Sequence, residues 1–160
     1  MFSPDSPAPP ESPLDTYRTS AYEVDLPKHW TVVPSGRDNA VSFQSAADDA
    51  GLMIDVDFYD IPADKARSTA ERLINARLAA LQQQAPGQVD MFDSGVQSHR
   101  QGRGLEMHYA AHVARRDVVM YVVTIVPQRV FNLTLVSKRS REEAMRLLRE
   151  VRSHFRPTLP

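Results

Sequence analysis

Apolar and polar residues alternate along several short stretches of this chain, and a period of two predicts half-buried β-strands. The clearest stretch spans residues 52–59, where every second position is apolar: Leu52, Ile54, Val56 and Phe58. Shorter or weaker alternation occurs at residues 22–26, 41–43 and 89–99. Each of these stretches is expected to form a strand with one face toward the core.

Three further strands are predicted in succession at residues 105–114, 118–126 and 130–137. The middle one is apolar almost throughout, which is typical of a central strand covered on both faces. Short turns at residues 115–117 and 127–129 separate the three. This arrangement predicts an antiparallel meander.

The apolar spacing changes to three and four residues in two places, which predicts helices. The first helix spans residues 63–84 and is closed by Pro86 and Gly87. The second begins after Ser140, which forms a capping box with Glu143. Its apolar stripe is expected to consist of Ala144, Leu147, Leu148, Val151 and Phe155.

This order of elements predicts an α+β fold, an α/β/α sandwich around an antiparallel sheet. Residues 1–16 are expected to form a Pro-rich flexible tail, residues 17–156 a single domain and residues 157–160 a C-terminal tail. As written, the chain lacks a signal peptide, which favours a cytoplasmic protein. A periplasmic protein or a lipoprotein is the alternative if the N-terminus has been trimmed.

Composition excludes several classes of function for this 160-residue chain. The net charge of −1 argues against a nucleic-acid-binding protein held by bulk charge. The absence of cysteine excludes disulfides, thiolate nucleophiles and cysteine-ligated metals. No apolar run is long enough to cross a bilayer. Charge is uneven along the chain, with −6 in residues 1–80 and +5 in residues 81–160, which could orient a partner.

Two groups of polar residues are candidates for catalytic or metal sites. His108 and His112 have the spacing of a helical zinc motif, with Glu106 nearby, but they lie on a predicted strand. Four residues along a strand separate two side chains by ~13 Å, too far for one metal ion. Asp55 and Asp57 lie ~7 Å apart on one strand face, a spacing that paired catalytic carboxylates use. A solvated strand face is the favoured interpretation of this pair.

Known motifs for nucleophiles and nucleotides are missing. The chain has no G-x-S-x-G sequence, and the Gly102–Gly104 segment lacks the further glycine and the lysine of nucleotide-binding loops. The sequence therefore predicts a protein that is not an enzyme and that uses no cofactor.

The chain resembles the PsbP-like family, in particular its bacterial DcrB-like branch. The matching features are Leu26-Pro27-x-x-Trp30 at the end of the first predicted strand, Val41-Ser42-Phe43, Leu133-Thr134-Leu135, and the order of strands and helices across residues 17–156. The resemblance implies an α/β/α sandwich and no common catalytic residues. It also implies action by binding, and the related proteins include Eag-type chaperones of type VI secretion effectors.

These observations predict a non-enzymatic protein-binding or adaptor module of a bacterial cell, associated with secretion or with the envelope. Its partner is expected to be another protein of unknown identity, and a homodimer is one of the assemblies it allows. If one sheet face is uncovered, the partner-binding residues are Val119, Tyr121 and Val123, together with His108 and His112. The alternatives are an Eag-type effector chaperone, or a small-ligand binder or enzyme that uses the His108 and His112 face.

Trp30, the only tryptophan, is expected in the core at the end of the first predicted strand. Its alternative role is an exposed anchor for a partner, because tryptophan is enriched at binding hot spots.

Overall fold

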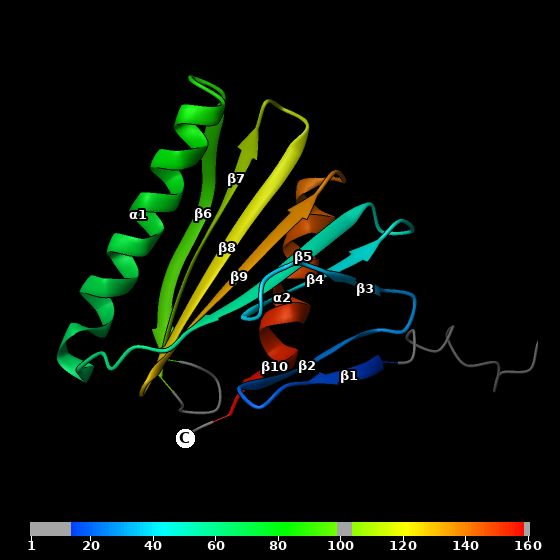
Figure 1. Cartoon of the computed structure of the whole chain (residues 1–160). Helices are drawn as coiled ribbons and strands as arrows, with labels where there is room; N and C mark the ends of the chain where they lie inside the picture. Colours follow the sequence, from blue (N-terminus) through cyan, green and yellow to red (C-terminus); the bar gives the residue numbers. More distant parts are fainter. Residues whose placement is uncertain (1–13, 99–103, 159–160) are drawn as a thin grey trace, which may run out of the picture.

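The computed structural model describes residues 14–98 and 104–158, which form two antiparallel sheets, two α-helices and one turn of 3-10 helix. The larger sheet has seven strands in the order β3-β4-β5-β9-β8-β7-β6 (Figure 1). Its strands are β3 (Thr31–Pro34), β4 (Ala40–Ser45), β5 (Ala50–Asp57), β6 (Val89–Ser98), β7 (Leu105–Val113), β8 (Asp117–Val126) and β9 (Arg129–Ser137). The predicted meander of β7, β8 and β9 is confirmed, because consecutive strands pair antiparallel.

Helix α1 (Ala66–Gln84) covers one face of this sheet, over β7 and β8. The 3-10 turn η1 (Ala63–Lys65) precedes it, so together they match the predicted helix. The buried side chains of α1, Ala70 and Ile74, lie one turn apart and pack into a cluster with Tyr109, Tyr121 and Val123 of the sheet.

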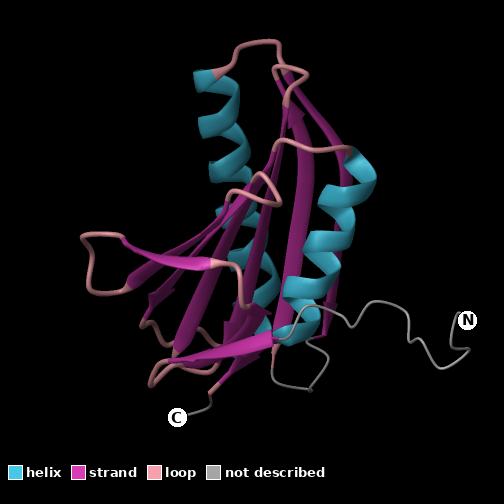
Figure 2. Cartoon of the chain, turned by 90° about the vertical axis from the view of Figure 1, so that its right-hand side faces the viewer, coloured by secondary structure: helices cyan, strands magenta, loops and turns pink. Residues whose placement is uncertain are grey.

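Helix α2 (Arg141–His154) and the smaller sheet cover the opposite face. Figure 2 shows the large sheet between the two helices, as the predicted sandwich requires. The predicted cap is present, since the backbone N–H of Glu143 donates to Ser140 Oγ at 3.2 Å. The main core lies on this side and includes Phe43, Ile54, Val122, Phe131, Leu133, Leu148 and Phe155.

Trp30 belongs to this core with 7% of its surface exposed, so its predicted burial is confirmed. The Trp30 indole N–H donates to Asp48 Oδ2 at 2.9 Å. Burial alone would raise the pKa of Asp48, but hydrogen bonds from His29, Ser45 and Trp30 outweigh it and lower that pKa.

Three strands of the structure were not predicted: β1 (Leu14–Arg18), β3 and β10 (Phe155–Pro157). The chain therefore enters a sheet at Leu14, inside the segment expected to be a flexible tail. Residues 1–13 of that tail lie outside the described residues, as do residues 99–103, which include most of the Gly102–Gly104 segment. Phe155 leaves the expected helix and pairs with Val24, although it remains in the core.

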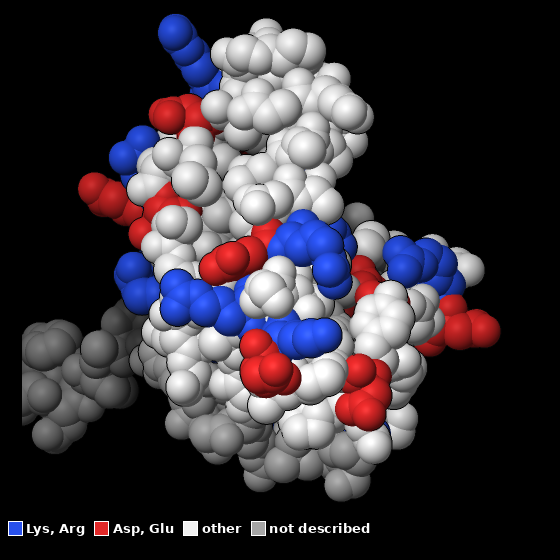
Figure 3. All heavy atoms as spheres, turned by 90° about the vertical axis from the view of Figure 1, so that its left-hand side faces the viewer, with Lys and Arg blue, Asp and Glu red and all other residues white. Residues whose placement is uncertain are grey.

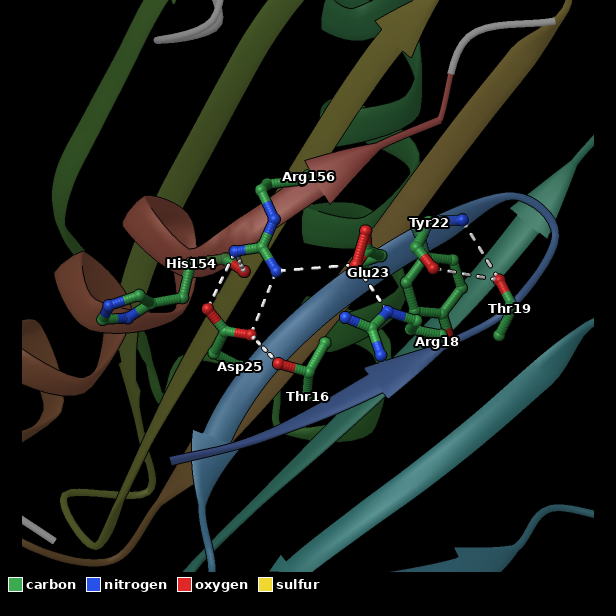
Figure 4. A network of polar contacts seen from close by, with 8 residues as sticks. All are labelled: Thr16, Arg18, Thr19, Tyr22, Glu23, Asp25, His154 and Arg156. Carbon is green, nitrogen blue, oxygen red and sulfur yellow. Dashed lines mark hydrogen bonds and ion pairs between the residues drawn. The ribbon is translucent and has the colours of Figure 1, made fainter. Parts of the chain in front are cut away.

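The smaller sheet has the order β1-β2-β10, with β2 (Tyr22–Pro27) in the centre. A polar network ties its three strands together, as Figure 4 shows. The Arg156 guanidinium donates to both Asp25 oxygens at 2.8 and 3.0 Å, and Thr16 Oγ1 donates to the same carboxylate at 2.6 Å. Two ends of the described chain are thereby held against β2, which local sequence patterns do not reveal.

We expect this network to make stability depend on acid. The hydrogen bonds from Arg156, followed by the other contacts, lower the pKa of Asp25 from 3.8 to about 2. A carboxyl with a lowered pKa stabilises the fold above its unfolded pKa, and this contribution is lost as the pH falls from about 4 toward 2. Asp25→Asn should therefore lower the free energy of unfolding by about 2 kcal/mol near neutral pH.

Urea denaturation of the wild-type protein and the variant across this pH range measures the effect. The difference in the free energy of unfolding between the two proteins should disappear as the solution approaches pH 2. A difference that stays the same across this pH range would show that Asp25 does not carry this part of the acid dependence.

Candidate functional site

One half of the large sheet lacks a helix on the α1 side, and this half forms the candidate site. Residues paired across neighbouring strands lie on the same face. One such row runs Val33, Ser42, Met53, Thr134, Tyr121 and Tyr109 across six strands. Tyr109 and Tyr121 lie beneath α1, whereas Met53 is 36% exposed. Figure 1 shows α1 over the β6 side of the sheet, with β5, β4 and β3 beyond it.

We call the uncovered part of this face the open face. It consists of Thr31, Val33, Ser42, Gln44, Gly51, Met53, Val119, Thr134 and Val136, all of them exposed or half-buried. None of these nine residues is charged. The hairpin of β3 and β4 projects to the same side of the sheet as α1 (Figure 2), so the open face extends from that hairpin toward the helix.

A buried polar network borders the open face where β5 and β9 pass the middle of α1. Tyr121 donates its hydroxyl hydrogen to Asn132 Oδ1. Asn132 Nδ2 donates to Asp55 Oδ1 at 2.8 Å and to Asp57 Oδ2 at 3.3 Å. Asp55 is 6% exposed and Asn132 is 4% exposed. The interpretation of the Asp55 position as a solvated strand face is therefore wrong, because the network buries it.

Arg77 of α1 supplies the positive charge nearest to these carboxylates. Its Nη1 donates to Thr134 Oγ1 at 3.1 Å, and its Nη2 lies 3.9 Å from Asp55 Oδ2. The guanidinium carbon sits 4.5 Å from the centre of the Tyr121 ring, within reach of a cation–π contact. Arg77 is therefore the ion-pair partner of Asp55.

The tyrosines under α1 keep their protons at neutral pH. Burial raises the pKa of Tyr121 far above its ordinary value and that of Tyr109 to about 12. Because the Tyr121 hydroxyl is a donor within the network, it holds Asn132 in place. The arrangement fits a structural polar cluster that positions Asp55 and Asp57.

The structure places the three predicted partner-binding residues of β8, Val119, Tyr121 and Val123, in two different environments. Tyr121 and Val123 are 1% and 0% exposed beneath α1, so their expected exposure is wrong. Helices cover both faces of β8 at these positions, which β8 periodicity alone does not reveal. Val119 is half-buried on the open face, and it stays a predicted contact residue.

The two predicted histidines lie on the opposite face and have separate partners. His108 is buried, with its Nε2 2.9 Å from Asp93 Oδ2. His112 is half-buried, and Arg141 Nε lies 3.3 Å from its Nε2. Within residues 14–98 and 104–158, no three His, Asp or Glu side chains are grouped as metal ligands.

Sequence reasoning missed Asn132, Arg77, Thr134 and Met53 as members of one site. Asn132 carries a signal that could have been used, because it stands between Phe131 and Leu133 in an apolar strand. A polar residue at such a position needs a buried hydrogen-bond partner. Its partners are on β5 and β8, so only the pairing of strands identifies them.

A concave region lies between the smaller sheet and α2. It has a volume of about 380 Å³, and its lining includes Leu26, Trp30, Asp48, Arg146 and Leu147. Acidic and basic side chains alternate around it, and several are paired with each other, such as Arg139 with Glu143. This groove therefore presents no charge of one sign to a ligand.

The described part of the chain has the fold of PsbP and Mog1 proteins, an α+β sandwich. Cyanobacterial PsbP (CyanoP) from Synechocystis sp. PCC 6803 is similar with a TM-score of 0.63 and 19% identity, over 92% of this chain and 94% of that one. The Ran-binding protein Mog1p of Saccharomyces cerevisiae is similar with a TM-score of 0.61 and 7% identity, over 91% and 95%. A second Mog1 structure, of a mutant, has a TM-score of 0.59 and 10% identity over 89% and 95%.

At these identities the likeness shows the fold alone. It confirms the predicted PsbP-like architecture, whereas the DcrB-like branch and the Eag-type chaperones stay predictions. No family model and no curated protein matches the sequence. Among the described helices, none is long and apolar enough to cross a membrane.

Proposed function

We propose that this chain is a non-enzymatic protein-binding module that docks its partner on the open face. The observation that carries the proposal is the uncharged surface across five strands that no described helix covers, with Met53 36% exposed near its middle. The central part of protein interfaces is depleted of charged residues in the same way.

The bordering network supports binding rather than catalysis. Asn132 is hydrogen-bonded to Asp55, Asp57 and Tyr121, so the polar groups hold one another. A general base needs a carboxylate or imidazole within reach of a substrate proton, whereas Asp55 is buried. The similar yeast protein Mog1p is a Ran-binding protein, which supports the same class of function for this fold.

Photo-crosslinking in the cells that produce the protein tests the proposal. A photoreactive amino acid replaces Met53 on the open face or, as a matched control, Met91 on β6. Met91 is 50% exposed and lies near the other edge of the sheet. We expect a discrete crosslinked protein at position 53 and none at position 91. Gln44→Trp, which places a bulky neutral side chain on the open face, should abolish the crosslink.

Equal crosslinking at both positions, or none at position 53, would contradict the proposal.

The identity of the captured protein tests the narrower hypotheses about the partner and the location of this chain. An Eag-type chaperone predicts a secretion effector, and an envelope-associated adaptor predicts an envelope protein. A cytoplasmic partner would support the cytoplasmic location.

A further inference from the structure

We propose that the partner of the open face is a basic protein segment, with one arginine or lysine placed on Asp57. This inference rests on the proposed function and names the chemistry of its partner. It follows from the acidic charge of the segment that contains β3, β4 and β5 and from the incomplete pairing of the Asp57 carboxylate at the border of the open face.

The segment that contains the strands of the uncovered half is acidic, with Asp55 and Asp57 in β5 and the other acidic residues in the loops. Residues 31–60, which contain β3, β4 and β5, include one basic residue and six acidic ones, a formal charge of −5. The acidic residues are Asp38, Asp48, Asp49, Asp55, Asp57 and Asp60. An acidic region of this kind raises the association rate of a basic partner and lowers that of an acidic one.

Four of these residues, Asp38, Asp55, Asp57 and Asp60, lie in β5 or in the loops next to its end, at the border of the open face. Val56 N donates to Asn39 O at 3.0 Å, which holds the loop between β3 and β4, with Asp38, beside the end of β5. Asp57 is the last residue of β5, and Asp60 follows in the exposed segment. The basic side chains of this region, Arg37, Arg77 and Arg129, leave acid in excess.

Two of these three arginines, Arg77 and Arg129, are already engaged. Arg77 is hydrogen-bonded to Thr134 and stacked on Tyr121, and its ion pair is with Asp55. Arg129 lies over the Phe58 ring and donates to the carbonyl of Thr158. Asp57 is half-buried, and its contact is the 3.3 Å hydrogen bond from Asn132. A cation from a partner would complete the pairing of this carboxylate.

Two alternatives to a basic partner on the open face are less well supported. The side of the molecule drawn in Figure 3 mixes acidic and basic side chains without a region of one sign. A second copy of the chain could offer its basic α2 region, residues 138–156, which carry seven basic residues against three glutamates. That contact would join different surfaces of the two copies, so it would build rings or open chains of molecules and not a two-fold dimer. We therefore assign the open face to a different protein.

Two synthetic peptides test the proposal: a repeat of arginine, serine and valine, and its counterpart with glutamate in place of arginine. Binding is measured by fluorescence anisotropy, and the site is mapped by amide chemical shifts of the isotope-labelled protein. We expect the arginine peptide to shift Met53, Ser42 and Asp57, with weaker binding at high salt. The glutamate peptide should leave these signals unchanged.

A pair of variants with opposite charges at one exposed position distinguishes the effect of charge on binding from the effect of losing an apolar contact. Met53→Lys should weaken the arginine peptide about fivefold relative to Met53→Glu, because both remove the same methionine. Asp57→Asn should weaken it, whereas Asp90→Asn on β6, with the same change in net charge, should not. Thermal unfolding of each variant shows whether it is folded.

The proposal is overturned if both peptides bind alike, or if Met53→Lys and Met53→Glu weaken binding equally. It is overturned as well if no signal of the open face shifts up to the solubility limit of the arginine peptide. It is also overturned if the crosslink from position 53 joins two copies of this chain. A crosslink to another protein without any preference for basic peptides would leave the proposed function intact and remove this inference alone.

Discussion

Replacing Arg152 with methionine should destabilise this protein by about 3–5 kcal/mol, because it leaves a buried carboxylate without its counter-charge. Glu106 of β7 is 4% exposed, and Arg152 of α2 approaches its Oε1 with Nη2 at 2.6 Å and Nε at 2.7 Å. Gln97 Nε2 also donates to this oxygen at 3.0 Å, but it carries no charge. The ion pair joins α2 to the sheet across the main core side. Urea denaturation at neutral pH measures the loss.

Two controls separate the burial of the charge from the loss of the arginine itself. The double variant Glu106→Leu with Arg152→Met removes both charges and should recover much of the lost stability. Arg67→Met breaks the exposed pair with Glu71 on α1 and should change stability by less than about 1 kcal/mol. If Arg152→Met costs no more than Arg67→Met, the buried pair does not stabilise the fold as argued.

Trp30→Ala should also cost about 3–5 kcal/mol, as truncation of a large buried aromatic residue does. Trp30 is 7% exposed at the junction of β2 and β3, and its indole N–H is bound to Asp48. A domain of this size has a total stability of about 5–15 kcal/mol, so the variant should be partly unfolded or should melt at a much lower temperature. Calorimetry or circular dichroism on heating measures this loss.

Fluorescence of the wild-type protein checks the same burial without a mutation, since Trp30 is the only tryptophan. We expect blue-shifted emission that iodide does not quench. Trp30→Phe keeps an aromatic ring in the core and loses the bond to Asp48, so it should cost less than Trp30→Ala. A red-shifted, readily quenched tryptophan would contradict the core position.

The candidate site shows where prediction from the sequence stops. The clear alternation in β5 is enough to place Asp55 and Asp57 on one strand face. The burial of Asp55 was not predicted, since it depends on Asn132 of β9 and Arg77 of α1, which are distant in the sequence. The exposure of Tyr121 and Val123 was expected wrongly for a related reason: an apolar strand does not reveal which of its neighbours a helix covers.

Local patterns by themselves determined the two helices, the cap at Ser140, the central β8 strand and the α+β class. These features depend on spacing within a few residues, where side-chain period and backbone hydrogen bonding are directly linked. Only the tertiary structure decided the membership of β1, β3 and β10, because such short strands are stabilised by pairing with distant partners. It also decided the position of α1, which covers β7 and β8 and leaves the strands β3 to β5 uncovered. The open face exists because the seven-stranded sheet is wider than the single helix packed on that side.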